Sequence, residues 1–251
     1  MLLAVLAAWV LTARGAAGAT TQDPARVLSL AGQLLTDPAY ARHTYASLLR
    51  VIGAVLMSVA LGTALMLAAR FVPYARILVA HRVLPILNAV PTVSWAILAV
   101  VWFGVNDVAV VAVIVAILLP FTMVNVWTAL LTLDEELYEM AKSFTRHRWR
   151  RLRLLIVPAL VPAIVASARL SYGVGWKVGI VAELFGVTTG FGYLLSYART
   201  IFDIELLYAV TLVIVLLVVA LDAAVFSRLE RYVTRHRADA PRTGIPAASH
   251  I

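Results

Sequence analysis

The residues of this 251-residue chain that could do chemistry are a few charged and aromatic side chains inside a long apolar stretch. Arg169, Trp176 and Glu183 are spaced seven apart, so they share one face of a helix, and Lys177 follows Trp176 directly. A charge near the centre of a membrane costs about 2.5–3.5 kcal/mol, so such residues usually face a cavity or a partner. We therefore expect these four residues, together with Trp95, to line the path of an anionic substrate.

Two other interpretations of the same side chains remain open. Glu183 could form an internal bridge with a lysine or arginine, Lys177 among them, and Arg169 could extend to the cytoplasmic interface of the membrane. In either case the charges would stabilise the fold and would not contact a substrate.

The second chemically distinct stretch is a charged island at residues 132–162, between two apolar runs. Thr132 and Glu135 have the spacing of a capping box, and acidic residues at 134–136 favour a helix N-terminus there. A polar helix in this position must face water or a partner. Its basic residues are Lys142, Arg146, Arg148, Arg150, Arg151 and Arg153.

No catalytic or metal-binding motif is visible in the sequence. There is no G-x-x-x-x-G-K-[ST] loop, no G-x-S-x-G elbow and no H-E-x-x-H pair, and cysteine is absent. The five histidines are scattered without ligand spacing. The chain is therefore predicted to have no catalytic residues, no metal site and no bound cofactor.

Composition indicates an all-α integral membrane protein. Hydrophobic residues make up 63% of the chain and charged residues 14%, against about 45–50% and about 25% in soluble domains. The mean hydropathy is +0.93. The net charge of +8 is explained by the excess of basic residues in cytoplasmic loops of membrane proteins.

Six membrane-spanning helices are predicted, and they imply three regions. Residues 1–45 would hold a first span, whose beginning the sequence may lack, and an extracytoplasmic segment with a short helix; a cleaved signal peptide is the alternative for residues 1–13. Residues 46–231 would form the transmembrane domain and residues 232–251 a disordered cytoplasmic tail. The other spans are expected at 51–69, 83–105 (interrupted by Pro85, Asn88 and Pro91), 108–133, 154–182 and 204–227.

Two ladders of small residues predict close helix contacts. One is Ala54, Ser58 and Gly62, and the other is Ser167, Ser171, Gly175 and Gly179. Placing the charged island in the cytoplasm puts most of the lysine and arginine residues on that side. Both termini are then cytoplasmic.

The charged island resembles the EAA loop of the permease subunits of bacterial ABC importers. That loop reads E-A-A, three residues, Gly, nine residues and I-x-L-P, and here Glu139, Ala141 and Pro158 match it. Met140 replaces the first Ala, and Thr145 stands at the Gly position. A β-branched residue is strained in the positive-φ turn that a Gly suits, so the turn has either strain or another shape.

Further elements are similar to the nitrate, sulfonate and taurine branch of these permeases: S-L-L-R at 47–50, P-T-V-S-W at 91–95, V-W-F-G at 101–104, G-W-x-V-x-x-V-A-E at 175–183 and T-G-F-G-Y-L at 189–194. The resemblance implies a six-span permease of the type I fold that acts as a homodimer in the bacterial inner membrane. Branch members carry nitrate, taurine and other sulfonates, bicarbonate, or vitamin-like precursors.

The same resemblance implies two partners. Residues 134–153 would be the coupling helix that docks on a separate cytoplasmic ATPase, which uses ATP and Mg²⁺, and a periplasmic or lipid-anchored solute-binding protein would deliver the solute. A self-sufficient secondary transporter or channel, or a membrane enzyme, is the alternative class. The expected ATPase contacts are Glu139, Met140, Ala141, Thr145, Arg148, Trp149 and Pro158.

Overall fold

The computed structural model describes residues 24–70, 89–132, 143, 147–226 and 228–229, and all regular structure within them is helical. The prediction of an all-α protein is confirmed. The helices are α2 (Pro24–Thr36), α3 (Pro38–Ala69), α6 (Thr92–Phe103), α7 (Asp107–Leu131), α9 (Arg148–Arg151), the π-helical turn η2 (Leu152–Ile156), α10 (Val157–Gly186), α11 (Phe191–Thr200), α12 (Ile204–Leu221) and the π-helical turn η3 (Asp222–Phe226).

Four helical segments in the described part of the chain are long and apolar enough to cross a membrane. They are Pro38–Ala69, Asp107–Leu131, Trp149–Gly186 and Ile204–Phe226, and they overlap four of the predicted spans. A span needs about 20 residues because the hydrocarbon core is about 30 Å thick and a helix rises 1.5 Å per residue.

Of the other two predicted spans, the one at 83–105 contains a shorter helix than expected, and the one at 1–13 lies outside the described residues. Within the described residues, the span predicted at 83–105 is the 12-residue helix α6, which begins after Pro91 and ends at Gly104. Twelve residues reach only about 18 Å, so α6 alone is too short to cross. Residues 71–88, the predicted first span at 1–13 and the predicted tail at 232–251 lie outside the described residues.

Prolines mark the starts of the first two described helices. Both α2 and α3 begin with proline, and the Asp37 side chain caps α3 by accepting a hydrogen bond from the Ala39 amide, 2.8 Å away. The fixed φ of proline suits the first helical turn, where its missing N–H is not needed. Because α3 is continuous from Pro38, it begins well before residue 51, and the boundary drawn at residue 45 falls inside it.

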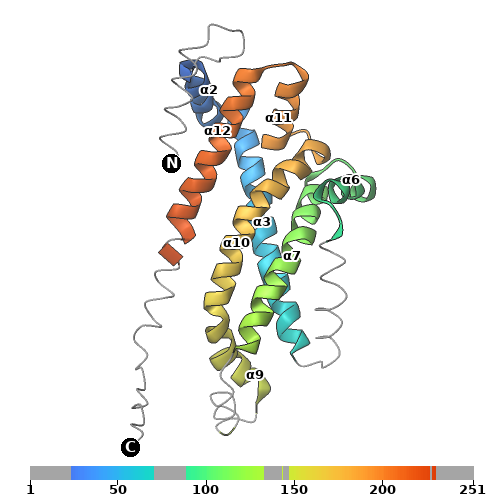
Figure 1. The fold of residues 1–251 in the computed structure, drawn as a ribbon, viewed down its shortest axis with the longest axis vertical. Coiled ribbons are helices and arrows are strands. Elements are labelled where there is room, and N and C mark those ends of the chain that lie inside the picture. The colour runs from blue at the N-terminus through green and yellow to red at the C-terminus, as the bar shows by residue number, and fades with distance from the viewer. Residues whose placement is uncertain (1–23, 71–88, 133–142, 144–146, 227, 230–251) are drawn as a thin grey trace, which may run out of the picture.

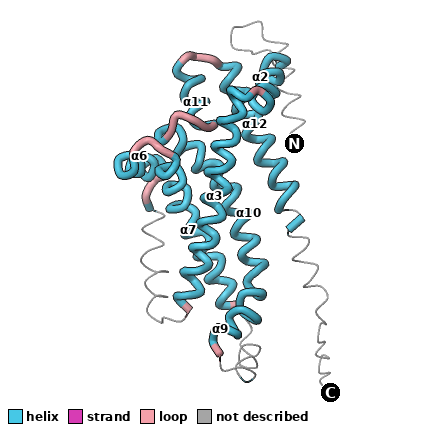
Figure 2. The backbone as a smooth tube through the Cα atoms, turned by 180° about the vertical axis from the view of Figure 1, so that it is seen from behind, coloured by secondary structure: helices cyan, strands magenta, loops and turns pink. Residues whose placement is uncertain are grey.

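The core is a bundle of α3, α7 and α10, which lie side by side in Figures 1 and 2. The predicted small-residue ladders lie at these contacts. A Cβ added to Gly62 would approach Thr122 Cγ2 of α7 within 2.8 Å, and one added to Gly179 would approach Val51 Cγ2 of α3 within 2.9 Å. The small residues therefore set how closely α3 and α10 pack on their neighbours.

The long helix containing α10 connects the two ends of the molecule. It is helical from Trp149 to Gly186, 38 residues, so it is about 57 Å long. In Figure 1, α9 lies at the lower end of this helix, and α11 lies at the upper end, where α2 and the start of α12 are also found. The described end of the charged island, at Trp149, and Glu183 are thus near opposite ends of one helical segment.

Candidate functional site

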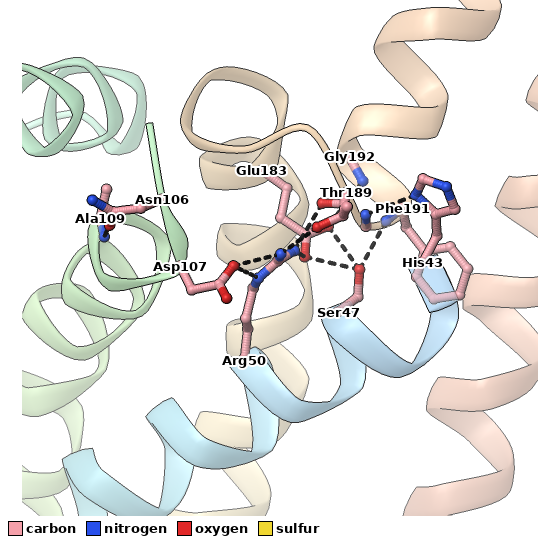
Figure 3. Close-up of polar contacts among 11 residues, drawn as sticks. His43, Ser47, Arg50, Asn106, Asp107, Ala109, Glu183, Thr189, Phe191 and Gly192 are labelled. Carbon is pink, nitrogen blue, oxygen red and sulfur yellow. Dashed lines mark hydrogen bonds and ion pairs between the residues drawn. The ribbon is translucent and has the colours of Figure 1, made fainter. Parts of the chain in front are cut away.

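The main polar feature of the upper end is a buried ion-pair network around Glu183 of α10 (Figure 3). The Glu183 side chain is only 1% exposed and lies 2.8 Å from Nη1 of Arg50 on α3. Ser47 Oγ lies 2.8 Å from both carboxylate oxygens and donates to the carboxylate, and the Gly192 amide donates to Oε2 over 2.9 Å. The buried carboxylate therefore has a countercharge and hydrogen bonds, as a charge in an apolar interior requires.

Arg50 joins three segments through one guanidinium group. Its Nε and Nη2 donate to Asp107 Oδ1 over 2.9 and 2.6 Å, and Nη1 and Nη2 donate to the carbonyl and hydroxyl of Thr189 over 2.8 and 2.6 Å. Asp107 is the first residue of α7, where Asn106 caps the helix by accepting from the Ala109 amide. A planar group with five donors suits this multiple contact better than a lysine would.

The same network caps α11, whose own N-cap residue, Gly190, has no side chain. The Gly190 amide donates to His43 Nδ1 over 3.1 Å and the Phe191 amide to Ser47 Oγ over 2.8 Å. Together with the Glu183 bond to Gly192, these contacts satisfy three of the four amides that a helix start leaves unpaired. The carboxylate also complements the positive end of the α11 dipole.

The turn before α11 requires glycine. Gly190 has φ 111° and ψ 174°, a conformation that is essentially restricted to glycine, and a Cβ there would lie 2.6 Å from the Glu183 carboxylate. A Cβ on Gly192 would collide with the Ile180 carbonyl. The close approach of this turn to Glu183 is therefore possible only without side chains.

The network holds four helices together, and its central groups, Arg50 and Glu183, are paired with each other. Each donor of Arg50 has an acceptor, and both oxygens of Glu183 accept hydrogen bonds. No group of three histidine, aspartate or glutamate residues suitable for a metal ion occurs among the described residues. The arrangement can fix α11 relative to α3, α7 and α10.

Arg169, Trp176 and Glu183 lie seven residues apart on α10 as predicted, but each contacts a different partner. Glu183 pairs with Arg50, so the internal-bridge interpretation holds for Glu183, but the cation comes from α3 and is neither Lys177 nor Arg169. Arg169 instead forms a two-point ion pair with Asp222, with Nε–Oδ1 and Nη2–Oδ2 distances of 3.0 and 2.8 Å. This pair lies near the other end of α12, where η3 begins.

The predicted path aromatics belong to the core. Trp176 is buried, packs edge-on against Tyr172 at 6.2 Å between ring centroids, and lies 6.2 Å from Phe191. Trp95 of α6 is half-buried against the same core. Lys177, in contrast, is exposed on the outer face of α10. Of the five predicted path residues, Lys177 alone is freely accessible in the single chain.

The charged island is described only in part. Glu139, Met140, Ala141, Thr145 and the side chain of Arg148 lie outside the described residues. Trp149 is 75% exposed in α9, and Pro158 is exposed near the start of α10. The π-helical turn η2 precedes Pro158, as expected where a proline cannot donate to the carbonyl four residues earlier.

Sequence analysis identified Glu183 but did not identify Arg50, Asp107, His43 and Ser47 as members of the site. The available signal was the spacing of His43, Ser47 and Arg50 at i, i+4 and i+7, which places three polar side chains on one helix face at the end of an apolar run.

The fold and the comparison with known sequences define the class of the protein. Residues 60–236 match the sequence profile of the binding-protein-dependent transport system inner membrane components, and the chain belongs to this family. It is an ABC-importer permease with the type I permease fold, a multi-pass membrane protein that is not itself catalytic. The family predicted from the EAA-like island is confirmed.

Relatives place the chain in the predicted branch. It is 26% identical to the taurine transport system permease protein TauC of Escherichia coli K12 over 199 residues, 78% of this chain and 72% of the relative. It is 30% identical over 116 residues to the putative aliphatic sulfonates transport permease protein SsuC of Bacillus subtilis 168, which is 46% of this chain and 42% of the relative. It is 30% identical over 146 residues to the riboflavin transport system permease protein RibX of Chloroflexus aurantiacus. These residues cover 57% of this chain and 54% of the relative.

Proposed function

We propose that this chain acts as a homodimeric permease that imports a small anionic solute and is driven by separate cytoplasmic ATPase subunits bound to residues 134–153. The observation that carries the proposal is that a basic helix end with an exposed tryptophan is joined, through the π-helical turn η2, to α10 in one helical segment of 38 residues. ATP and Mg²⁺ belong to the partner, and a solute-binding protein delivers the solute.

The exposed helix end has the chemistry of a docking element. Trp149 is flanked by exposed Arg150 and Arg153, and tryptophan and arginine dominate the energetics of protein interfaces. A large aromatic side chain in water gains free energy when a partner buries it. A helix attached to such a contact can transmit a displacement to its other end, where Glu183 holds α3 and α11.

This proposal also fixes the orientation. The α9 end is cytoplasmic, because it carries the basic island and would contact the ATPase. The end with α11 and the network is then extracytoplasmic, and both termini are cytoplasmic in the bacterial inner membrane. The self-sufficient transporter remains the alternative, and it would take up solute without ATP.

Replacing Trp149 with alanine should weaken ATPase binding at least tenfold, about 1.4 kcal/mol, because the side chain loses its buried contact with the partner. Glu139→Lys should have a similar effect through the EAA-like segment. The measurement is the amount of ATPase subunit that copurifies with the permease, together with ATP-dependent uptake in proteoliposomes.

The matched control is Trp102→Ala, because Trp102 is an equally large, exposed tryptophan of α6, away from the α9 end. It should leave copurification unchanged. Equal ATPase binding by wild type, Trp149→Ala and Glu139→Lys would contradict the proposed coupling surface, and uptake by wild type without ATP would contradict the importer itself.

The anionic character of the solute rests on Lys177. In the single chain this lysine is exposed on a face of α10 between the exposed apolar residues Leu170 and Leu184, seven positions away on each side. Lipid is an unfavourable environment for an ammonium group, so this face is better explained as lining a water-filled path or a second copy. A positive charge there attracts an anion more strongly than in bulk water.

Lys177→Met should reduce uptake of the accepted anion by roughly tenfold, about 1.4 kcal/mol, while the melting temperature stays unchanged because no buried partner is left unpaired. Lys177→Arg, which keeps the charge, should retain most of the uptake. The assay is initial uptake of labelled taurine, an alkanesulfonate or nitrate, whichever the wild type accepts. Unchanged uptake by Lys177→Met would exclude Lys177 from the path.

A further inference from the structure

The corner between α11 and α12 has an unusual backbone conformation at an aromatic residue. The Asp203 amide donates to the Ala198 carbonyl over 2.9 Å and the Phe202 amide to the Arg199 carbonyl over 3.4 Å. These two bonds form a Schellman motif, which places Phe202 at the left-handed position that glycine usually occupies. Its φ is 57°, and it is the one non-glycine residue with positive φ among the described residues.

Among the residues that the structure describes, no packing contact of the Phe202 side chain compensates for this strain. The Phe202 side chain is 87% exposed, so it gains little packing in exchange for a backbone conformation that a bulky residue rarely adopts. A glycine would form the same motif without strain. The side chain is therefore best explained by a contact outside the chain.

The position of Phe202 favours a water-soluble partner over lipid. The corner lies at the opposite end of the molecule from α9 in both Figure 1 and Figure 2. Asp203 and Glu205 follow Phe202 at the start of α12, and Glu205 pairs with exposed Arg26 of α2 at 3.4 Å. Because these charges precede the apolar part of α12, Phe202 lies on the water side of them, whereas an interfacial anchor would lie on the membrane side.

Other exposed apolar residues flank Phe202 on both helices. Tyr197 and Ile201 share a face of α11, and Ile204 and Tyr208 share a face of α12, since each pair is four residues apart. Together with Phe202 they form what we call the corner patch. An exposed aromatic residue within an apolar patch, bordered by charged residues, is typical of an interface hot spot and its polar rim.

We infer that the corner patch docks the soluble solute-binding protein, with Phe202 as the anchoring side chain. The inference rests on the proposed function, which places this corner outside the cytoplasm, and on membership of a family whose transport depends on a binding protein. On this inference, the cost of the left-handed backbone at Phe202 is offset in the complex, where the binding protein buries the ring.

The test uses the complete transporter in proteoliposomes and the binding protein obtained as the osmotic-shock protein that restores uptake to spheroplasts. Phe202→Gly should raise the melting temperature of the permease by about 2–4 °C, because the left-handed strain is removed. The same variant should increase the half-saturating concentration of binding protein at least tenfold, and uptake at saturation should stay within about twofold of wild type.

Two further variants separate docking from general effects. Phe202→Ala should show the same loss of docking with a smaller gain in stability, since it keeps a Cβ in the strained position. Leu28→Ala removes an exposed apolar side chain of α2 at the same end of the molecule. It should change neither the half-saturating concentration of binding protein nor the melting temperature of the permease. An unchanged half-saturating concentration in Phe202→Gly overturns the inference, and a lower melting temperature in lipid overturns it in favour of a membrane contact.

The outcome also distinguishes this inference from the proposed function. If uptake requires no solute-binding protein, soluble or lipid-anchored, or needs no ATP, the proposed function fails and the docking inference fails with it. If wild-type uptake depends on the binding protein and on ATP, and Phe202→Gly behaves as wild type, the docking inference alone fails.

Discussion

Replacing Arg50 with methionine is expected to lower the free energy of unfolding by about 3–5 kcal/mol, because it leaves the Glu183 carboxylate buried without its countercharge. Ser47 and the Gly192 amide would still donate to this carboxylate, but two neutral donors do not replace a guanidinium group. The start of α11 should loosen as well, since Arg50 also holds Thr189 in the preceding turn.

The chain offers a matched control for the Arg50 prediction. Arg26 and Glu205 form another Arg–Glu pair, but Arg26 is 72% exposed and the pair distance is 3.4 Å. Exposed pairs contribute about 0–1 kcal/mol, so Arg26→Met should have little effect on stability. Thermal unfolding of both variants in lipid nanodiscs measures the difference, and equal losses would mean that the network does not stabilise the fold.

A double variant tests whether the loss comes from the stranded charge. In Arg50→Met with Glu183→Gln the buried group is neutral, and its amide oxygen can still accept from Ser47 and Gly192. The double variant should therefore be more stable than Arg50→Met alone, although contacts of Arg50 with Asp107 and Thr189 remain lost. A double variant no more stable than Arg50→Met would rule out the stranded carboxylate as the cause.

Gly190→Ala should destabilise the permease by about 2–6 kcal/mol, combining the strain of a glycine-only backbone conformation with a steric clash against Glu183. The added methyl group would lie 2.6 Å from the carboxylate, which is held by Arg50 and Ser47 and cannot move away freely. Relieving the clash would separate α11 from the bundle.

The control for Gly190→Ala is Gly173→Ala in α10, where an added Cβ meets nothing within 4 Å. Alanine is favoured over glycine inside a helix by about 0.8–1 kcal/mol, so this variant should be as stable as wild type or slightly more stable. Melting temperatures and the yield of folded protein measure both effects. A Gly190→Ala variant as stable as Gly173→Ala would contradict the tight turn seen in Figure 3.

The sequence alone determined the features that depend on local composition. Runs of apolar residues long enough to cross a bilayer identify α3, α7, α10 and α12, because residues in lipid must be apolar and satisfy their own backbone hydrogen bonds. The prolines at 24 and 38 mark helix starts because their fixed φ suits the first turn. The charged island and the elements around it were sufficient to predict the family.

A helical pattern is less informative about short or interrupted segments. Prolines and Asn88 lie in the stretch predicted as a span at 83–105, and local hydropathy could not show that α6 begins only at Thr92. The predicted span began only at residue 51, whereas α3 runs without a break from Pro38, and His43, Ser47 and Arg50 in this earlier part face α10 and the turn before α11.

Only the tertiary structure decided the partner of each buried charge. Glu183 could have paired with several cations, and those nearest in sequence lie on its own helix, where positions six or more residues apart are separated by about 9 Å or more along the axis. The small residues of α3 and α10 let these helices pack closely, and this contact brings Arg50 to within 2.8 Å of a carboxylate 133 positions later in the chain. Pairing of charges between helices depends on which helices pack together and at what height, and periodicity within one helix carries no information about either.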